Sequence, residues 1–212
     1  MRSLEHDHEG KVVLGVAILA AGASIRMGRS KMLLPWKGTS VIGHVIEVWT
    51  EKLSAAQVAV VCAPAPSPVP GELDRLGFPE RHRIVNPAPD RGMFSSIQSA
   101  EAWTGWNGTL THVALCLGDQ PHVRVETLRK LLCSVQGCPS AIHQPCLNER
   151  PKHPIIFPIA AFRSLAETQH RTLRDFLANS NRTLVDVDDA GLNLDLDYPT
   201  DYEAALALAG EQ

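Results

Sequence analysis

Residues 19–31 carry the clearest chemical signal in this chain. They read LAAGASIRMGRSK and combine two glycines, Gly22 and Gly28, with cations that include Arg26 and Lys31. A backbone that turns at the glycines points several N–H groups at one anion, and Lys31 adds a mobile positive charge. The spacing matches neither the G-x-x-x-x-G-K-[ST] loop nor the G-x-G-x-x-G fingerprint, so an ordinary strand-to-helix turn is the alternative. We interpret the segment as a polyphosphate-binding loop.

Three acidic residues follow later in the chain, close to predicted strand ends. Asp119 comes directly after the apolar run 111–117, in the sequence Gly-Asp-Gln-Pro. A helix-capping role is the alternative for Asp119, but the next helix is expected to begin near Val125, so we favour a Mg²⁺ ligand. Asp195 and Asp197 are expected to share one side of an extended strand, where one of them completes the metal site.

The remaining aspartates near the C-terminus are assigned structural roles. Asp201 falls in the first turn of a helix that Pro199 begins, where a carboxylate complements the helix dipole. Asp186, Asp188 and Asp189 are expected to form a solvated turn.

A further polar segment lies between these motifs, at residues 86–97. Its Gly92 allows a sharp turn, and Ser95 and Ser96 stand at the start of a predicted helix, where backbone N–H groups are free. Capping explains one serine. The second serine and the glycine favour hydrogen bonds to a ligand such as a nucleotide base or ribose.

Strand-like and helix-like segments alternate along the chain. Strands are predicted at 12–20, 57–63, 84–85, 111–117, 141–142, 154–157 and 184–187. Helices are predicted at 40–53, 93–103, 125–135, 172–177 and 201–209, and the proline-rich stretch 64–70 is predicted as a loop. This alternation predicts an α/β protein, with a doubly wound, mostly parallel sheet and helices on both faces. Ligands bind such sheets outside the carboxyl ends of the strands.

Length and composition predict one domain. The 212 residues are 44% hydrophobic, enough for one substantial core, so residues 12–212 are expected to form a single domain after a flexible tail at 1–11. A net charge of −3 with scattered basic residues does not favour nucleic acid or an anionic membrane as partner. No apolar run is long enough for a membrane span.

The N-terminus and the cysteines favour a cytoplasmic protein. Glu5, Asp7 and Glu9 make the first residues unlike the positive region of a secretory signal. The cysteines number five, and no C-x-x-C occurs, so neither a disulfide framework nor a structural zinc site is expected.

Five segments, in order along the chain, resemble motifs of the nucleotidyltransferases that mature the molybdenum cofactor. They read LAAGASIRMGRSKMLLPW, NPAPDRGMFSSI, GDQP, HPIIF and DLDYPTDY. The guanylyl branch of that family shows L-A-G-G and an aspartate before the lysine; with Ala21 and Ser30 there, this chain resembles the cytidylyl branch. The resemblance implies a Rossmann-like nucleotidyltransferase fold, with CMP transferred from CTP to the terminal phosphate of molybdopterin. It also implies release of pyrophosphate and a Mg²⁺ cofactor.

The resemblance and the residue chemistry together define the expected site. The catalytic residues are Arg26, Lys31 and Asp119. The nucleotide-binding residues are Leu19, Ala20, Ala21, Gly22, Ser24, Arg26, Gly28, Lys31, Asn86, Gly92, Ser95, Ser96 and Asp119. The metal ligands are Asp119, Asp195 and Asp197, and the acceptor is expected to contact Gln120, His153 and Arg174. Lys31 is expected to be exposed, so its removal should leave the fold intact.

The chain departs from the family pattern on the acceptor side. Lys152 replaces the glycine of G-H-P, Tyr198 replaces the threonine of D-I-D-T-P, and residues 168–174 lack the Gly-Asp of the family. A nucleotidylyltransferase for another phosphorylated acceptor, such as a sugar phosphate, is therefore the alternative enzyme. A non-catalytic chaperone that binds the molybdenum cofactor is the alternative from a different class. A molybdoenzyme or its chaperone is the protein that such a family member would contact transiently.

Overall fold

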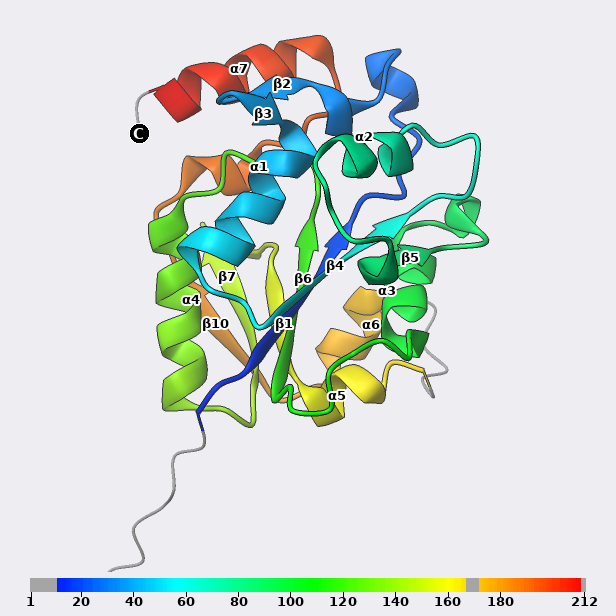
Figure 1. Cartoon of the computed structure of the whole chain (residues 1–212). Coiled ribbons are helices and arrows are strands. Elements are labelled where there is room, and N and C mark those ends of the chain that lie inside the picture. The colour runs from blue at the N-terminus through cyan, green and yellow to red at the C-terminus, as the bar shows by residue number, and fades with distance from the viewer. Residues whose placement is uncertain (1–10, 167–171, 211–212) are drawn as a thin grey trace, which may run out of the picture.

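The computed structural model describes residues 11–166 and 172–210, which form a twisted central sheet between two layers of helices (Figure 1). The main strand order is β10 (Arg182–Asp186), β7 (Ile142–Leu147), β9 (Ile155–Pro158), β6 (His112–Leu117), β1 (Leu14–Leu19), β4 (Gln57–Cys62) and β5 (Arg83–Val85). The short β8 (Arg150–Pro151) pairs with β7. Strand β1 lies between β4 and β6 and is parallel to both, whereas β9 is antiparallel to β6 and β7. The predicted mostly parallel α/β sheet is confirmed.

Helices cover both faces of the sheet because the buried strands are apolar on both sides. In β1, Val16 and Ile18 face one core and Ala17 and Leu19 face the other, as the period of two in a strand requires. The first core includes residues of α1 (Val41–Glu47), its π-helical continuation (Val48–Lys52), α2 (Val69–Arg75) and α4 (Val125–Gly137). The second includes residues of α3 (Met93–Ala102), α5 (Ile159–Arg163) and α6 (Leu173–Ala178). No helix in the described ranges is long and apolar enough to cross a membrane.

A smaller apolar cluster lies outside the sheet and fixes the C-terminal segment. Helix α7 (Pro199–Gly210) lies across the hairpin of β2 (Pro35–Trp36) and β3 (Thr39–Ser40), as Figure 1 shows. Buried Trp36, Leu196 and Ala205 belong to this cluster. The packing brings the chain before α7 close to the segment that follows the first strand.

Several elements differ from the predictions in ways that depend on long-range pairing. The proline-rich loop ends early, because α2 begins at Val69 with Pro70 in its first turn, where the missing N–H costs nothing. The antiparallel direction of β9, helix α5 and the β2–β3 hairpin were not predicted. The predicted tail at 1–11 lies outside the described residues except for residue 11.

Asp189 corrects the prediction of a solvated turn. Asp186 and Asp188 are exposed as expected, but Asp189 is completely buried. Its carboxylate accepts hydrogen bonds from the backbone N–H of Arg124 (2.9 Å), the hydroxyl of Thr127 (2.8 Å) and the backbone N–H of Gly191 (3.0 Å). It therefore joins the start of α4 to the 3₁₀ turn Ala190–Asn193.

We expect Asp189→Ala to lower the free energy of unfolding by on the order of 3 kcal/mol, because three buried donors lose their acceptor. Urea unfolding followed by circular dichroism measures the change. The exposed neighbour is the control, and Asp188→Ala should change stability by less than about 0.5 kcal/mol. Equal effects of the two substitutions would contradict the structural role of Asp189.

Candidate active site

A cavity of about 500 Å³ opens beyond the carboxyl ends of β1 and β6. It gathers many of the predicted nucleotide-site residues. Its lining is Leu19, Ala21, Gly22, Arg26, Lys31, Met32, Pro89, Gly92, Met93, Ser96, Leu117, Asp119, Asp195 and Asp197. A second hollow of about 270 Å³ shares Gly22, Arg26, Lys31 and Asp197 with it. Residues far apart in the sequence thus meet at the edge of the sheet where ligands of this fold class bind.

The glycine-rich loop is held in shape by its own backbone. The backbone pairing with β4 continues one residue past the end of β1, because the N–H of Ala20 donates to the carbonyl of Val61 (2.8 Å). Ser24 has a left-handed backbone, and its hydroxyl accepts the N–H of Lys31 (3.2 Å). Gly28 closes a 3₁₀ turn with φ of +67°, a conformation that favours glycine. Ser24 and Gly28 therefore close the loop and bring Lys31 back towards its start.

Lys31 lies between two carboxylates. Its Nζ contacts Asp119 Oδ2 and lies 3.2 Å from Asp197 Oδ1. The prediction that Lys31 is exposed is wrong, since only 12% of its side chain is accessible. Burial lowers the pKa of Lys31, but Asp119 and then Asp197 outweigh burial, and the pKa is raised from its usual value. Lys31 is therefore an ammonium ion at neutral pH.

Arg26 is the outer cation of the site. Its Nη1 lies 2.9 Å from Asp197 Oδ2, and its guanidinium lies over the ring of Tyr198, 5.6 Å from the centroid. The hydrogen bond to Tyr198 and the charge of Asp197 raise the pKa of Arg26. Tyr198, which replaces the family's threonine, thus contacts a cation of the glycine-rich loop.

The segment before α7 is a tight turn and not a strand. The N–H of Asp197 donates to the carbonyl of Asp195 (2.9 Å), so the prediction that the two side chains share one side of an extended strand is wrong. Asp201 accepts from the N–H groups of Asp197 (3.1 Å) and Tyr198 (2.7 Å), which confirms its structural role. Asp195 Oδ1 accepts from the amide of Gln120 (3.1 Å). Both carboxylates still line the cavity.

The carboxylates provide hard oxygen donors for a divalent cation. Asp119 does not cap α4, which begins at Val125 after Arg124. Asp119 and Asp197 converge on the same ammonium group, so both can face one ion. Within the described ranges, no group of three or more His, Cys, Asp or Glu residues gathers as a metal site. Two carboxylates completed by substrate phosphate oxygens form a donor set typical of Mg²⁺.

Asn86, Ser95 and Ser96 bind one another. Asn86 is buried, and its amide donates to the hydroxyls of Ser95 (2.8 Å) and Ser96 (3.0 Å). Its carbonyl oxygen accepts the N–H of Ala88 (2.9 Å). Ser96 lines the cavity beyond β1 and β6, whereas Asn86 and Ser95 line a separate hollow of similar volume. Asn86 and Ser95 therefore hold the loop that ends at Gly92 (φ of +89°) against the first turn of α3.

A larger hollow of about 760 Å³ adjoins the cavity and shares Gly92 and Met93 with it. It contains two of the predicted acceptor residues, His153 and Arg174. Burial lowers the pKa of His153, which favours the neutral ring. Arg91 and Arg182, which also line it, were not predicted. Their only sequence signal was positive charge, and the position of Arg182 depends on β10 pairing with β7.

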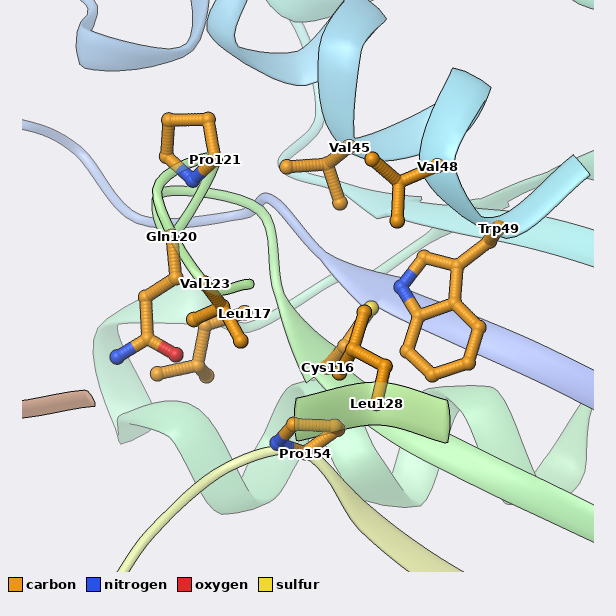
Figure 2. Close-up of a pocket in the computed structure, with 10 residues that line it drawn as sticks. All are labelled: Val45, Val48, Trp49, Cys116, Leu117, Gln120, Pro121, Val123, Leu128 and Pro154. Atoms are coloured by element: carbon orange, nitrogen blue, oxygen red, sulfur yellow. The ribbon is translucent and has the colours of Figure 1, made fainter. Parts of the chain in front are cut away.

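Gln120, the remaining predicted acceptor residue, lies at the edge of a small void of about 20 Å³. Figure 2 shows Val45, Val48 and Trp49 on one side of this void and Cys116 and Leu128 on the other. The lining is mostly apolar and the volume is close to that of one water molecule, so we regard the void as a packing gap behind the Asp119 loop.

The chain resembles known proteins over most of its length. The sequence pattern of the MobA-like NTP transferase domain matches residues 16–184. The chain is 26% identical over 191 residues to the molybdenum cofactor cytidylyltransferase of Escherichia coli (strain K12), covering 89% of this chain and 93% of that protein. The crystal structure of Rv0371c from Mycobacterium tuberculosis H37Rv is similar, with a TM-score of 0.74, 24% identity and coverage of 93% of this chain and 99% of that chain. A crystal structure of Rv0371C in complex with manganese gives a TM-score of 0.66, 23% identity and coverage of 92% and 99%. The expected Rossmann-like nucleotidyltransferase fold is confirmed.

We expect Lys31→Met to destabilise the protein by about 2–3 kcal/mol, a melting-temperature loss of about 5–10 °C, because two partly buried carboxylates lose their shared cation. The pKa of Lys31 is raised on folding. Its stabilisation is therefore fully present below about pH 10.5 and is lost as the pH rises through the higher pKa of the folded state. The melting temperatures of the wild type and of Lys31→Met, measured from pH 7 to 11, should therefore converge at alkaline pH.

The control for this comparison is Lys52→Met, since Lys52 is exposed at the end of the π-helical turn. It should melt like the wild type throughout. A Lys31→Met protein as stable as this control at pH 7 would show that the ion pairs are not structural.

Proposed function

Since the chain belongs to the MobA-like NTP transferase family and is a nucleotidyltransferase, we propose that it transfers CMP from CTP to the terminal phosphate of molybdopterin and releases pyrophosphate. The observation that carries this proposal is the cluster of Lys31, Asp119 and Asp197 beside the glycine-rich loop. In this proposal, the partly buried ammonium and the two carboxylates bind the triphosphate and its metal. The E. coli relative supports the choice of donor and acceptor.

The residues of the loop bind the triphosphate in this proposal. Backbone N–H groups of residues 22–28 surround the β- and γ-phosphates, and Lys31 and Arg26 neutralise the charge of the departing pyrophosphate. Both cations leave Asp197 for the phosphates when the nucleotide binds. The acceptor phosphate is already ionised and attacks the α-phosphorus in line, so no side chain has to serve as general base.

Mg²⁺ fits the donor set of this site. Asp119 and Asp197 would hold it, and a bound Mg²⁺ supplies positive charge for the α-phosphate oxygens during transfer. The manganese complex of Rv0371C, a protein of similar fold, supports a divalent cation. Asp195 instead keeps its hydrogen bond from the amide of Gln120, and a tight turn separates it from Asp197.

Ala21 supports a pyrimidine base. It is buried at the end of β1 and lines the 500 Å³ cavity. Its methyl group occupies space that the glycine of the guanylyl branch would leave open, which disfavours the larger purine. We therefore propose CTP as the donor.

The 760 Å³ hollow is the proposed acceptor site. Among the described residues that line it are Arg91, Arg174 and Arg182, together with Asp175, whose carboxylate accepts a hydrogen bond from Thr172. Excess positive charge suits an acceptor that carries a phosphate. The two hollows share a border at Gly92 and Met93, which supports a position for that phosphate next to the nucleotide.

One assay tests donor and acceptor together. The protein is incubated with Mg²⁺ and each of the four ribonucleoside triphosphates, with molybdopterin carrying molybdenum or with a panel of sugar phosphates, and pyrophosphate is measured. We expect release only with CTP plus the molybdenum cofactor. Release with a sugar phosphate instead would establish the alternative enzyme, and binding of cofactor without any pyrophosphate would favour a chaperone.

We expect Asp119→Asn to lower turnover at least about 100-fold, because the amide no longer holds the cation opposite the phosphates. Pyrophosphate release over a range of Mg²⁺ concentrations measures it. Asp188→Asn, at an exposed residue away from the cavity, is the control and should retain activity. An Asp119→Asn protein that merely melts earlier, with turnover preserved, would contradict the metal-ligand assignment.

We expect Arg174→Ala and Arg182→Ala each to raise the KM for the acceptor by about 10-fold without changing the KM for CTP, since a charged hydrogen bond contributes about 1.5 kcal/mol. Steady-state kinetics with either substrate varied separates the two effects. Arg129→Ala on exposed α4 is the matched control. A larger change in the KM for CTP would place these arginines on the donor side.

A further inference from the structure

His122 lies where the three loops of the active site meet. It follows the Asp119-Gln120-Pro121 turn and is 1% exposed. Its Nε2 lies 3.0 Å from the carbonyl oxygen of Gly191 and 2.8 Å from that of Leu194. Both carbonyls belong to the segment that leads directly into Asp195 and Asp197.

Strand β2, which follows the Lys31 turn, contacts His122 through an aromatic ring. The ring of Trp36 lies 6.2 Å from the imidazole, centroid to centroid, at an angle of 56°. Trp36 is buried and follows Lys31 by five residues. His122, on the loop that carries Asp119, therefore contacts both the segment that leads to Asp197 and strand β2, which follows the Lys31 turn.

The surroundings of His122 determine which ring nitrogen carries the proton. Nε2 faces two carbonyl oxygens, which only accept hydrogen bonds, so it carries the proton. Nδ1 is buried and has no hydrogen-bond partner among the described residues. A second proton on Nδ1 would have no acceptor there. Burial lowers the pKa of His122, although the carbonyls of Leu194 and Gly191 and the charges of Asp119 and Asp189 act in the opposite direction.

The backbone at Gly191 packs closely against His122. A Cβ on Gly191 would lie 2.9 Å from the carbonyl oxygen of His122 and 3.1 Å from its Cδ2. The glycine thus permits the backbone of the 3₁₀ turn to approach both the main chain and the ring of His122. The hydrogen bonds from His122 to the carbonyls of Gly191 and Leu194 fix the position of this turn relative to the ring.

We propose that His122 is a positioning residue for the divalent cation: its Nε2–H binds the carbonyls of Gly191 and Leu194 and so sets the separation of Asp119 and Asp197. The inference rests on the proposed function, because it takes these two carboxylates as the metal ligands. His122 touches neither substrate nor metal in this role. It acts through the backbone that carries the carboxylates.

A matched pair of substitutions tests the hydrogen bonds separately from the shape. Gln places an amide N–H donor near the position of Nε2, whereas Met has a similar length and no donor. Mn²⁺ binding in the presence of a non-hydrolysable CTP analogue is measured by electron paramagnetic resonance. We expect His122→Met to weaken Mn²⁺ binding at least tenfold and to raise the Mg²⁺ concentration needed for half-maximal turnover, and His122→Gln to remain within threefold of the wild type.

A second variant covers the case in which His122→Met fails to fold. Gly191→Ala leaves His122 in the sequence but places a Cβ 2.9 Å from its carbonyl oxygen and 3.0 Å from Asp189 Oδ1, so it pushes the same loops apart and should also weaken Mn²⁺ binding. Folding of each variant is checked by circular dichroism at the assay temperature. Wild-type Mn²⁺ affinity in folded His122→Met, or in folded Gly191→Ala if the Met variant does not fold, would overturn the inference and leave the proposed function intact. Absence of Mn²⁺ binding by the wild-type protein would instead contradict the proposed function.

Discussion

The active site depends on one ammonium group shared by two carboxylates. Lys31 comes from the loop after the first strand, Asp119 from the loop after β6, and Asp197 from the chain before α7. Without the ammonium, two negative charges would face each other in a partly buried site, where repulsion is poorly screened. With it, the carboxylates are held together before any nucleotide binds. In the proposed function, this arrangement keeps the cation for the phosphates and the oxygen ligands for the metal in one place.

The sheet explains why these groups meet. Strands β1 and β6 are adjacent and parallel, and Leu19 at the end of one is paired in register with Leu117 at the end of the other. The loops that follow therefore start at the same level, one with the glycine turn and one with Asp119. The third group arrives by a different route, because α7 packs on the β2–β3 hairpin and brings Asp197 back over the loop.

The same distinction explains what the sequence could predict. The alternation of apolar strands with helices is a local pattern, so the fold class and the positions of Lys31 and Asp119 at strand ends followed from it. The burial of Lys31 did not follow from this local pattern, because it depends on Asp197, which is 166 residues away. Asp189 was misjudged for the same reason, since its donors lie on Arg124 and Thr127. Arg182 reaches the 760 Å³ hollow only through the pairing of β10 with β7.

The two cations on Asp197 differ in their exposure to solvent, and this gives them different responses to salt. The side chain of Arg26 is 60% accessible, whereas that of Lys31 is 12% accessible. Dissolved ions screen interactions between exposed charges much more strongly than those between buried ones. Raising the ionic strength therefore loosens the outer contact first and leaves the inner ammonium in place. The loop therefore has two ion pairs with the same carboxylate. The strength of the Arg26 pair depends on the ionic strength, and the strength of the Lys31 pair hardly does.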